Sequence, residues 1–187
     1  MLVASQKRRE NIAEYLLYMW QVEDMIRALD LNIDRVRKHI IDPIPEIDDA
    51  TRDEIAGWYE SLIDMMRREN VETSGHLQIN RNTLGEIADL HRRVLADGRY
   101  DDYTRAFYDA LPSIVELRSH AGENPAGEIE TCFNALYAML LMRMQRREIS
   151  AATTEAMKKI SRFTAMLAAY YAKDERGELF GKDEEDK

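Results

Sequence analysis

One acidic residue, Glu23, falls within an otherwise apolar stripe of a predicted helix. When residues 6–29 are wound as a helix, apolar side chains recur on one arc, and Glu23 lies inside that arc. The arc is defined by Ile12, Leu16, Met19, Val22, Ile26 and Leu29. Burial of an unpaired carboxylate is strongly unfavourable. We therefore expect Glu23 to have a partner cation, a hydrogen-bond network, a bound proton or a covering surface.

Polar residues also fall on the apolar stripes of two other predicted helices. Asn80 and His91 lie on the stripe of residues 77–97, and Arg143 lies on that of residues 126–147. With two tyrosines added, the candidate polar core or pocket consists of Glu23, Asn80, His91, Arg143, Tyr15 and Tyr137. Because arginine is the usual partner of a buried carboxylate, we predict that Glu23 pairs with Arg143 first and with His91 second.

This candidate set has two interpretations. It forms either a structural network that fixes helix packing or a small pocket that binds a ligand or transfers a proton. The structural interpretation is favoured, because charges on a helical stripe belong more often to networks than to catalytic sites.

The four histidines, His39, His76, His91 and His120, are the candidate metal ligands. Di-iron helical bundles use a Glu-x-x-His pair, which places both ligands on one helix face. The sequence has no such pair, and its single cysteine, Cys132, cannot build a thiolate zinc site. We therefore expect no metal and no other cofactor.

Four acidic residues recur in a spacing associated with magnesium chemistry. Glu69-x-x-Glu72 is followed by Glu86-x-x-Asp89, and this resembles the carboxylate signature of all-helical nucleoside triphosphate pyrophosphohydrolases. On the helical wheel, however, Glu86 and Asp89 project away from the apolar side, so we expect the four carboxylates not to converge. The chain also lacks a nucleophile elbow, a phosphate-binding loop and a dinucleotide-binding glycine motif. Enzymatic activity is therefore the less favoured hypothesis.

Composition limits the class of protein and its partners. The 187 residues suffice for one domain, and the net charge of −9 disfavours binding to nucleic acid. A single cysteine is typical of a reducing compartment, which favours the cytoplasm. No apolar run reaches the roughly 18 residues that a membrane span requires.

The apolar positions recur at three and four residues throughout, and glycine and proline are few. The sequence therefore predicts an all-α fold, a single-domain bundle of about six to seven helices. The predicted helices are residues 6–29, 32–41, 48–74, 77–97, 103–117, 126–147 and 150–173. The predicted N-caps are Ser5, Asn32, either Asp48 or Asp49, Asn124 and Ser150.

The helix near residues 126–147 is apolar on more than one side. Ile129, Phe133, Leu136 and Leu140 form its main stripe, while Leu141 lies among further apolar residues on the opposite side. A helix that is apolar all round is usually central, so we expect this helix to be buried in the middle of the bundle. The alternative is that its second face forms a homodimer contact.

The C-terminal segment has little apolar content. Residues 175–187 include only Leu179 and Phe180 as large apolar side chains and end in a strongly acidic run. We expect a helical domain over residues 1–174 and a disordered acidic tail over residues 175–187. Removal of residues 176–187 should then leave the fold intact.

Three sequence blocks carry a resemblance to a known family. QKRRENIAEYLLYMWQVEDMIRALDLNID, GHLQINRN and IADLH resemble an uncharacterised family of small all-helical bacterial proteins, catalogued as a domain of unknown function. The resemblance extends from Gln6 to about Tyr171. It implies a cytoplasmic all-α protein and supplies no activity, cofactor or site residue. The favoured function is therefore a non-enzymatic helical interaction or scaffold module, and the alternative is a ligand-binding or enzymatic bundle with a buried polar pocket.

Overall fold

The computed structural model describes residues 2–122 and 125–180, and these residues form helices and no strand. The predicted all-α fold is confirmed. The elements are α1 Leu2–Glu10, α2 Ile12–Ala28, α3 Ile33–Val36, the π-helical turn η1 Arg37–Ile41, α4 Asp49–Arg68, α5 Gln78–Ala96, α6 Asp101–Ser119, α7 Glu128–Met144 and α8 Ala151–Glu175.

The described residues contain more elements than the six to seven helices expected, because two predicted helices are each divided. The first breaks at Asn11, whose side-chain oxygen accepts a hydrogen bond from the Ala13 N–H at 3.0 Å and so starts α2 afresh. The second changes from α-helical to π-helical geometry after Val36. Three of the predicted N-caps are confirmed, since Asn32, Asp48 and Ser150 each accept a backbone N–H. The predicted cap Ser5 was wrong, because α1 begins at Leu2 and Ser5 lies inside it. The predicted cap Asn124 lies outside the described residues.

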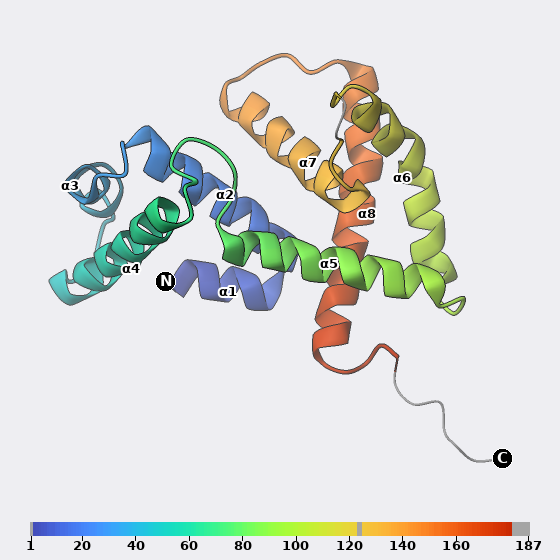
Figure 1. Cartoon of the computed structure of the whole chain (residues 1–187), viewed down its shortest axis with the longest axis horizontal. Helices are drawn as coiled ribbons and strands as arrows, with labels where there is room; N and C mark the ends of the chain where they lie inside the picture. The colour runs from blue at the N-terminus through green and yellow to red at the C-terminus, as the bar shows by residue number, and fades with distance from the viewer. Residues whose placement is uncertain (1, 123–124, 181–187) are drawn as a thin grey trace. The chain divides into compact units, whose positions relative to one another are not determined.

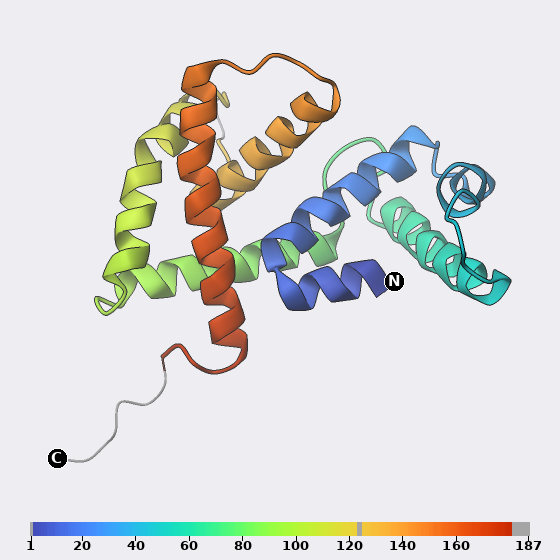
Figure 2. The same cartoon turned by 180° about the vertical axis from the view of Figure 1, so that it is seen from behind.

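The chain packs as two compact units. Unit 1 comprises Met1–Arg8 and Glu14–Thr83, and in it α3 and η1 pack against α4. Unit 2 comprises Arg9–Ala13 and Leu84–Lys187. In unit 2, α6 packs along α8, and α7 contacts both (Figures 1 and 2). The single domain over residues 1–174 stays a prediction.

Helix α7 is not the buried central helix that the sequence predicts near residues 126–147. Its buried side chains, such as Ile129 and Phe133, all lie in its first half. Leu140 and Leu141 are only half-buried, and Met144 is 66% exposed. Helix α7 therefore has more apolar side chains than its packing in unit 2 buries. The alternative interpretation, a homodimer contact, stays a prediction.

The segment after α8 carries two large apolar side chains, Leu179 and Phe180. Helix α8 continues to Glu175, and Leu179 is buried with 7% of its surface exposed. The Phe180 ring packs edge-on against Tyr100 at 5.9 Å and beneath the Arg93 guanidinium at 4.9 Å. The two apolar side chains of this segment therefore have packing partners, and the disordered tail over residues 175–187 stays a prediction. Residues 181–187 lie outside the described residues.

Candidate functional site

The buried carboxylate of Glu23 is the centre of a hydrogen-bond network in unit 1. Glu23 lies on α2 and is 0% exposed, as its place on the apolar stripe predicts. One carboxylate oxygen accepts the Leu77 N–H at 2.9 Å and the Asn80 side-chain amide at 2.7 Å. The other oxygen is 2.6 Å from Nδ1 of His76. Both oxygens are thus satisfied inside the protein, which removes the cost of burying an unpaired carboxylate.

The network closes the loop between α4 and α5. Leu77 immediately precedes α5, so its N–H belongs to the free donors at the start of that helix, where a negative charge is favourable. The Arg27 guanidinium, also on α2, donates to the carbonyls of Val71 and Gly75 in the same loop. Helix α2 therefore holds this loop in place through the buried Glu23 carboxylate and the Arg27 guanidinium. The role of both side chains here is structural.

His76 is the exposed edge of this network. Its ring stacks on Trp20 with centroids 4.2 Å apart and an interplanar angle of 13°. Its side chain is 29% exposed, whereas that of Glu23 is 0% exposed. A carboxylate that holds one ring nitrogen fixes the orientation of the imidazole, as in many proton-transfer sites. Nε2, the other ring nitrogen of His76, has no hydrogen-bond partner within the described residues. The described part of the chain therefore shows no serine, threonine or cysteine that this histidine could activate as a nucleophile.

The structure divides the predicted polar set. Glu23 and Asn80 are joined by a hydrogen bond. Arg143, the predicted first partner of Glu23, is exposed near the end of α7, beyond the buried first half of that helix. The pairing prediction was therefore wrong, and His76 holds the place assigned to Arg143 or His91.

His91 lies in an aromatic cluster of unit 2. Its Nδ1 is 2.7 Å from the Tyr103 hydroxyl, and its ring packs edge-on against Phe107 and Phe163. Burial, with a smaller contribution from Arg92, lowers the pKa of His91 to about 4. The His91 imidazole is thus neutral at physiological pH. His91 is therefore not the cationic partner of Glu23 that the sequence predicts as the second choice.

The two candidate tyrosines occupy different surroundings. Tyr15 is 7% exposed and lies beneath the Arg8 guanidinium, 5.3 Å from its ring centroid. Tyr137 is half-buried on α7 in unit 2. Within unit 1, the atoms that contact the Glu23 carboxylate come from His76, Leu77 and Asn80 and not from the Tyr15 hydroxyl.

The sequence missed His76 as the partner of Glu23. His76 stands in the loop between two predicted helices, and a helical wheel compares only residues of one helix. A signal was nevertheless present: His76 lies two residues before the start of α5, and helix N-termini attract anions such as the Glu23 carboxylate.

Three of the acidic residues in the predicted magnesium pattern have protein partners. Glu69 accepts the Gln78 N–H at 2.6 Å, Asp89 pairs with Arg92, and the Tyr171 hydroxyl donates to Glu86 at 3.1 Å. Across residues 2–122 and 125–180, no three histidine, cysteine or acidic side chains gather as metal ligands would.

An apolar cavity of about 470 Å³ lies in unit 1. One face of α4 forms a wall, with side chains spaced three and four residues apart. The other walls come from α1, α2, η1 and the connector that follows η1. The lining residues are Val3, Tyr18, Met25, Ile40, Ile44, Ile47, Thr51, Glu54, Ile55, Trp58 and Tyr59. The sequence did not predict this cavity, because its walls come from five separate segments.

Two phenol rings supply polar groups to the cavity. Burial raises the pKa of Tyr59 to about 12, and the neighbouring Tyr18 adds to the shift. Burial also raises the pKa of Tyr18. Both hydroxyls therefore stay neutral, and they can donate or accept hydrogen bonds at the wall of an otherwise apolar space.

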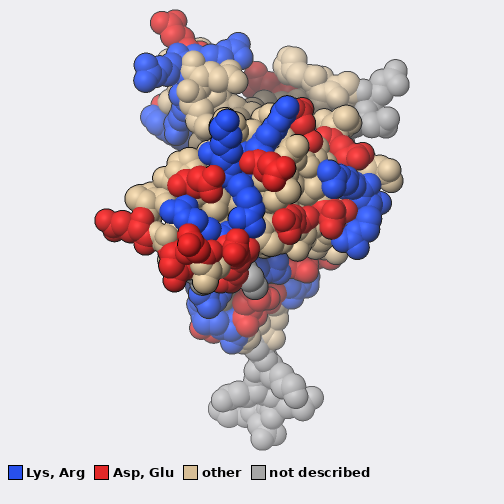
Figure 3. All heavy atoms as spheres, turned by 90° about the vertical axis from the view of Figure 1, so that its left-hand side faces the viewer, with Lys and Arg blue, Asp and Glu red and all other residues tan. Residues whose placement is uncertain are grey.

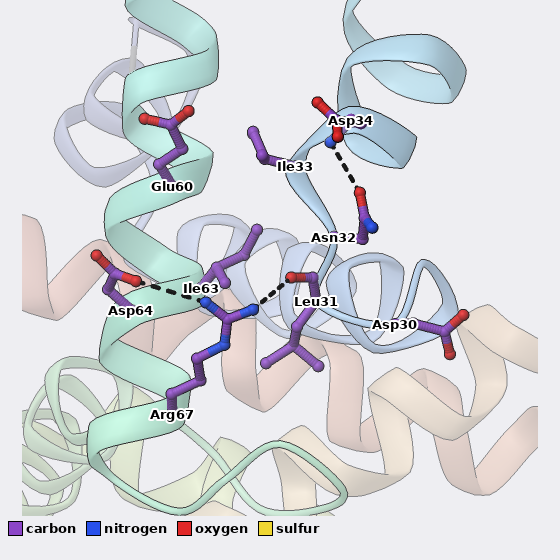
Figure 4. A pocket seen from close by; sticks show the side chains of 9 residues that line it. All are labelled: Asp30, Leu31, Asn32, Ile33, Asp34, Glu60, Ile63, Asp64 and Arg67. Atoms are coloured by element: carbon purple, nitrogen blue, oxygen red, sulfur yellow. Dashed lines mark hydrogen bonds and ion pairs between the residues drawn. The ribbon is translucent and has the colours of Figure 1, made fainter.

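A second hollow, of about 420 Å³, is polar and lies between α4 and the turn before α3 (Figure 4). Arg67 donates to the Leu31 carbonyl at 3.0 Å and lies 3.7 Å from Asp64. Asp30 and Leu31 have left-handed backbone angles, with φ of 57° and 52°. The cation in this hollow therefore holds a strained turn, which is a structural role.

A family model described as "Domain of unknown function (DUF4924)" matches residues 1–178. The chain belongs to this family. Comparison of the DUF4924 chain with curated proteins and with solved structures gives no match to either. The family therefore agrees with the resemblance seen in the sequence and adds no site residue.

One face of the DUF4924 protein carries both signs of charge. On the face seen in Figure 3, acidic and basic side chains are interspersed. Within the described ranges, no helix has the length and apolar character needed to cross a membrane. The apolar cavity of unit 1 has the size and the apolar lining of a small-molecule site.

Proposed function

We propose that this DUF4924 protein is a non-enzymatic helical binding module that takes an apolar small molecule into the cavity of unit 1. The observation that carries the proposal is the cavity itself, about 470 Å³ in volume and walled mainly by isoleucine and aromatic side chains. Small-molecule sites in proteins are typically about 300–1,000 Å³, mostly apolar, with a few polar groups that orient the ligand. The Tyr18, Tyr59 and Thr51 hydroxyls are such groups.

The size of the cavity favours a small molecule over a protein partner. A sphere of this volume has a wall of about 300 Å², whereas a stable protein interface buries roughly 800 Å² on each partner. The cavity alone is therefore too small to hold another protein, but it matches a ligand of small-molecule size.

The polar network at Glu23 supports a non-enzymatic role. The Glu23 carboxylate is fully buried and accepts three hydrogen bonds, so it is withheld from a substrate. The cavity wall holds no histidine, cysteine or lysine that could act as a base or nucleophile near neutral pH. The single cysteine favours a reducing compartment, which agrees with the proposed cytoplasmic location.

Isothermal titration with 1-octanol tests the proposal. The full chain should bind octanol, and Ile44→Trp, which fills the cavity from the connector, should abolish that binding while the circular dichroism spectrum is retained. Val115→Trp is the matched control, because Val115 is 54% exposed on α6. Absence of binding to the parent chain, or equal binding to the filled variant, would contradict the proposal.

A further inference from the structure

The wall of the unit 1 cavity carries one charged side chain, Glu54. Glu54 lies on the same face of α4 as Ile55 and Trp58, and no lysine or arginine lines the cavity. Within the described residues, Glu54 forms no ion pair. The cavity therefore presents a carboxylate without a protein cation beside a mostly apolar space.

Three aromatic rings, those of Tyr18, Trp58 and Tyr59, line the same cavity. The Trp58 and Tyr59 rings pack edge to face, with centroids 5.0 Å apart and an interplanar angle of 69°. The faces of aromatic rings carry partial negative charge and attract cations, and tryptophan does so most strongly.

The protein cation that lies over the Tyr18 ring, Lys7, is paired with another carboxylate. Lys7 Nζ lies 6.0 Å from the centroid of the Tyr18 ring and 3.3 Å from the Glu14 carboxylate. The Tyr18 ring thus already accepts a cation on one side, while the charge of Lys7 is balanced by Glu14 rather than by Glu54.

We infer that the ligand of this cavity is a small organic cation with an apolar body, such as an alkylammonium or arylammonium compound. This inference rests on the proposed function. The apolar body occupies the space between the isoleucines, and the ammonium group lies near Glu54 and the aromatic faces. An anionic amphiphile such as a fatty acid meets a repulsive carboxylate and no lining cation, so it is disfavoured.

The test compares three probes with the same eight-carbon chain: octylammonium, octanol and octanoate. Isothermal titration at neutral pH and low ionic strength measures the affinity of each for the full chain. Octylammonium should bind at least about fivefold more tightly than octanol, since cation–π and exposed ion-pair contacts are each modest. Octanoate should bind more weakly than octanol.

Two matched variants locate the origin of this preference. Glu54→Gln should remove most of the preference for octylammonium and leave the affinity for octanol unchanged. Glu60→Gln is the control, because Glu60 is an exposed acid on the same helix that lines the second hollow instead. That variant should bind all three probes as the parent does.

The possible outcomes separate the two claims. If octanoate binds as tightly as octylammonium, or if Glu54→Gln leaves the ratio of the octylammonium and octanol affinities unchanged, the inferred ligand class is wrong, while octanol binding still supports the proposed function. If none of the three probes binds, the proposed function and the inference both fail.

Discussion

Replacement of Glu23 by alanine should destabilise the protein by about 3–5 kcal/mol. The change removes the acceptor of the buried Leu77 N–H and of the Asn80 side-chain amide. A buried donor left without an acceptor costs about 1–3 kcal/mol, and two such donors account for most of the predicted loss. His76 contributes less, because its partly exposed side chain can bind water instead.

Urea and thermal denaturation followed by circular dichroism measure this effect. For a chain of this length, a loss of about 3 kcal/mol lowers the melting temperature by roughly 6–12 °C. Glu23→Gln should cost less, about 1 kcal/mol, because its amide oxygen can still accept from Leu77 and Asn80. Glu14→Ala is the control: Glu14 pairs with Lys7 at the surface, so its loss should change stability by no more than about 0.5 kcal/mol. A Glu23→Ala chain that melts like this control would refute the argument.

Three further predictions follow from other residues. Burial holds the pKa of His91 at about 4, below its ordinary value of 6.5, so the unfolded chain alone takes up this proton as the pH falls from 6.5 to 4. The contribution of neutral His91 to the free energy of unfolding should therefore be fully present above pH 6.5 and fall by up to about 3 kcal/mol by pH 4. In urea melts, the free energy of unfolding of His91→Gln should depend less on pH between 6.5 and 4 than that of the parent chain. Burial raises the pKa of Cys132 to about 12, so a thiol reagent should label it only after unfolding; rapid labelling of the native chain would contradict its buried position. Leu179→Ala should lower stability by about 2 kcal/mol, and a thermal melt identical to that of the parent would mean that Leu179 does not pack as described.

Periodicity predicted the helices and much of their burial, because both depend on residues close together in the chain. Glu23, Asn80 and His91 are buried, as their positions on apolar stripes indicate. The partner of Glu23 was not predictable in this way. His76 reaches Glu23 from a loop 53 residues further along the chain, and only the folded path of the chain brings the two together.

The exposure of Arg143 and the existence of the cavity were not predictable for a related reason. A wheel shows that one side of a helix is apolar, but it does not show whether another element covers that side. The buried side chains of α7 lie in its first half, whereas Arg143 in its last turn is exposed. The cavity likewise depends on how the connector after η1 passes over the apolar face of α4.

The most direct test of the central claim is methyl NMR of the full chain with labelled isoleucine side chains during a titration with octanol. Ile40, Ile44, Ile47 and Ile55 line the cavity of unit 1, whereas Ile87, Ile114 and Ile160 are buried in unit 2. A ligand in the cavity should shift the methyl signals of the first group and leave those of the second unchanged. Shifts that are absent, or that appear equally in both groups, would contradict the assignment of the cavity as the binding site.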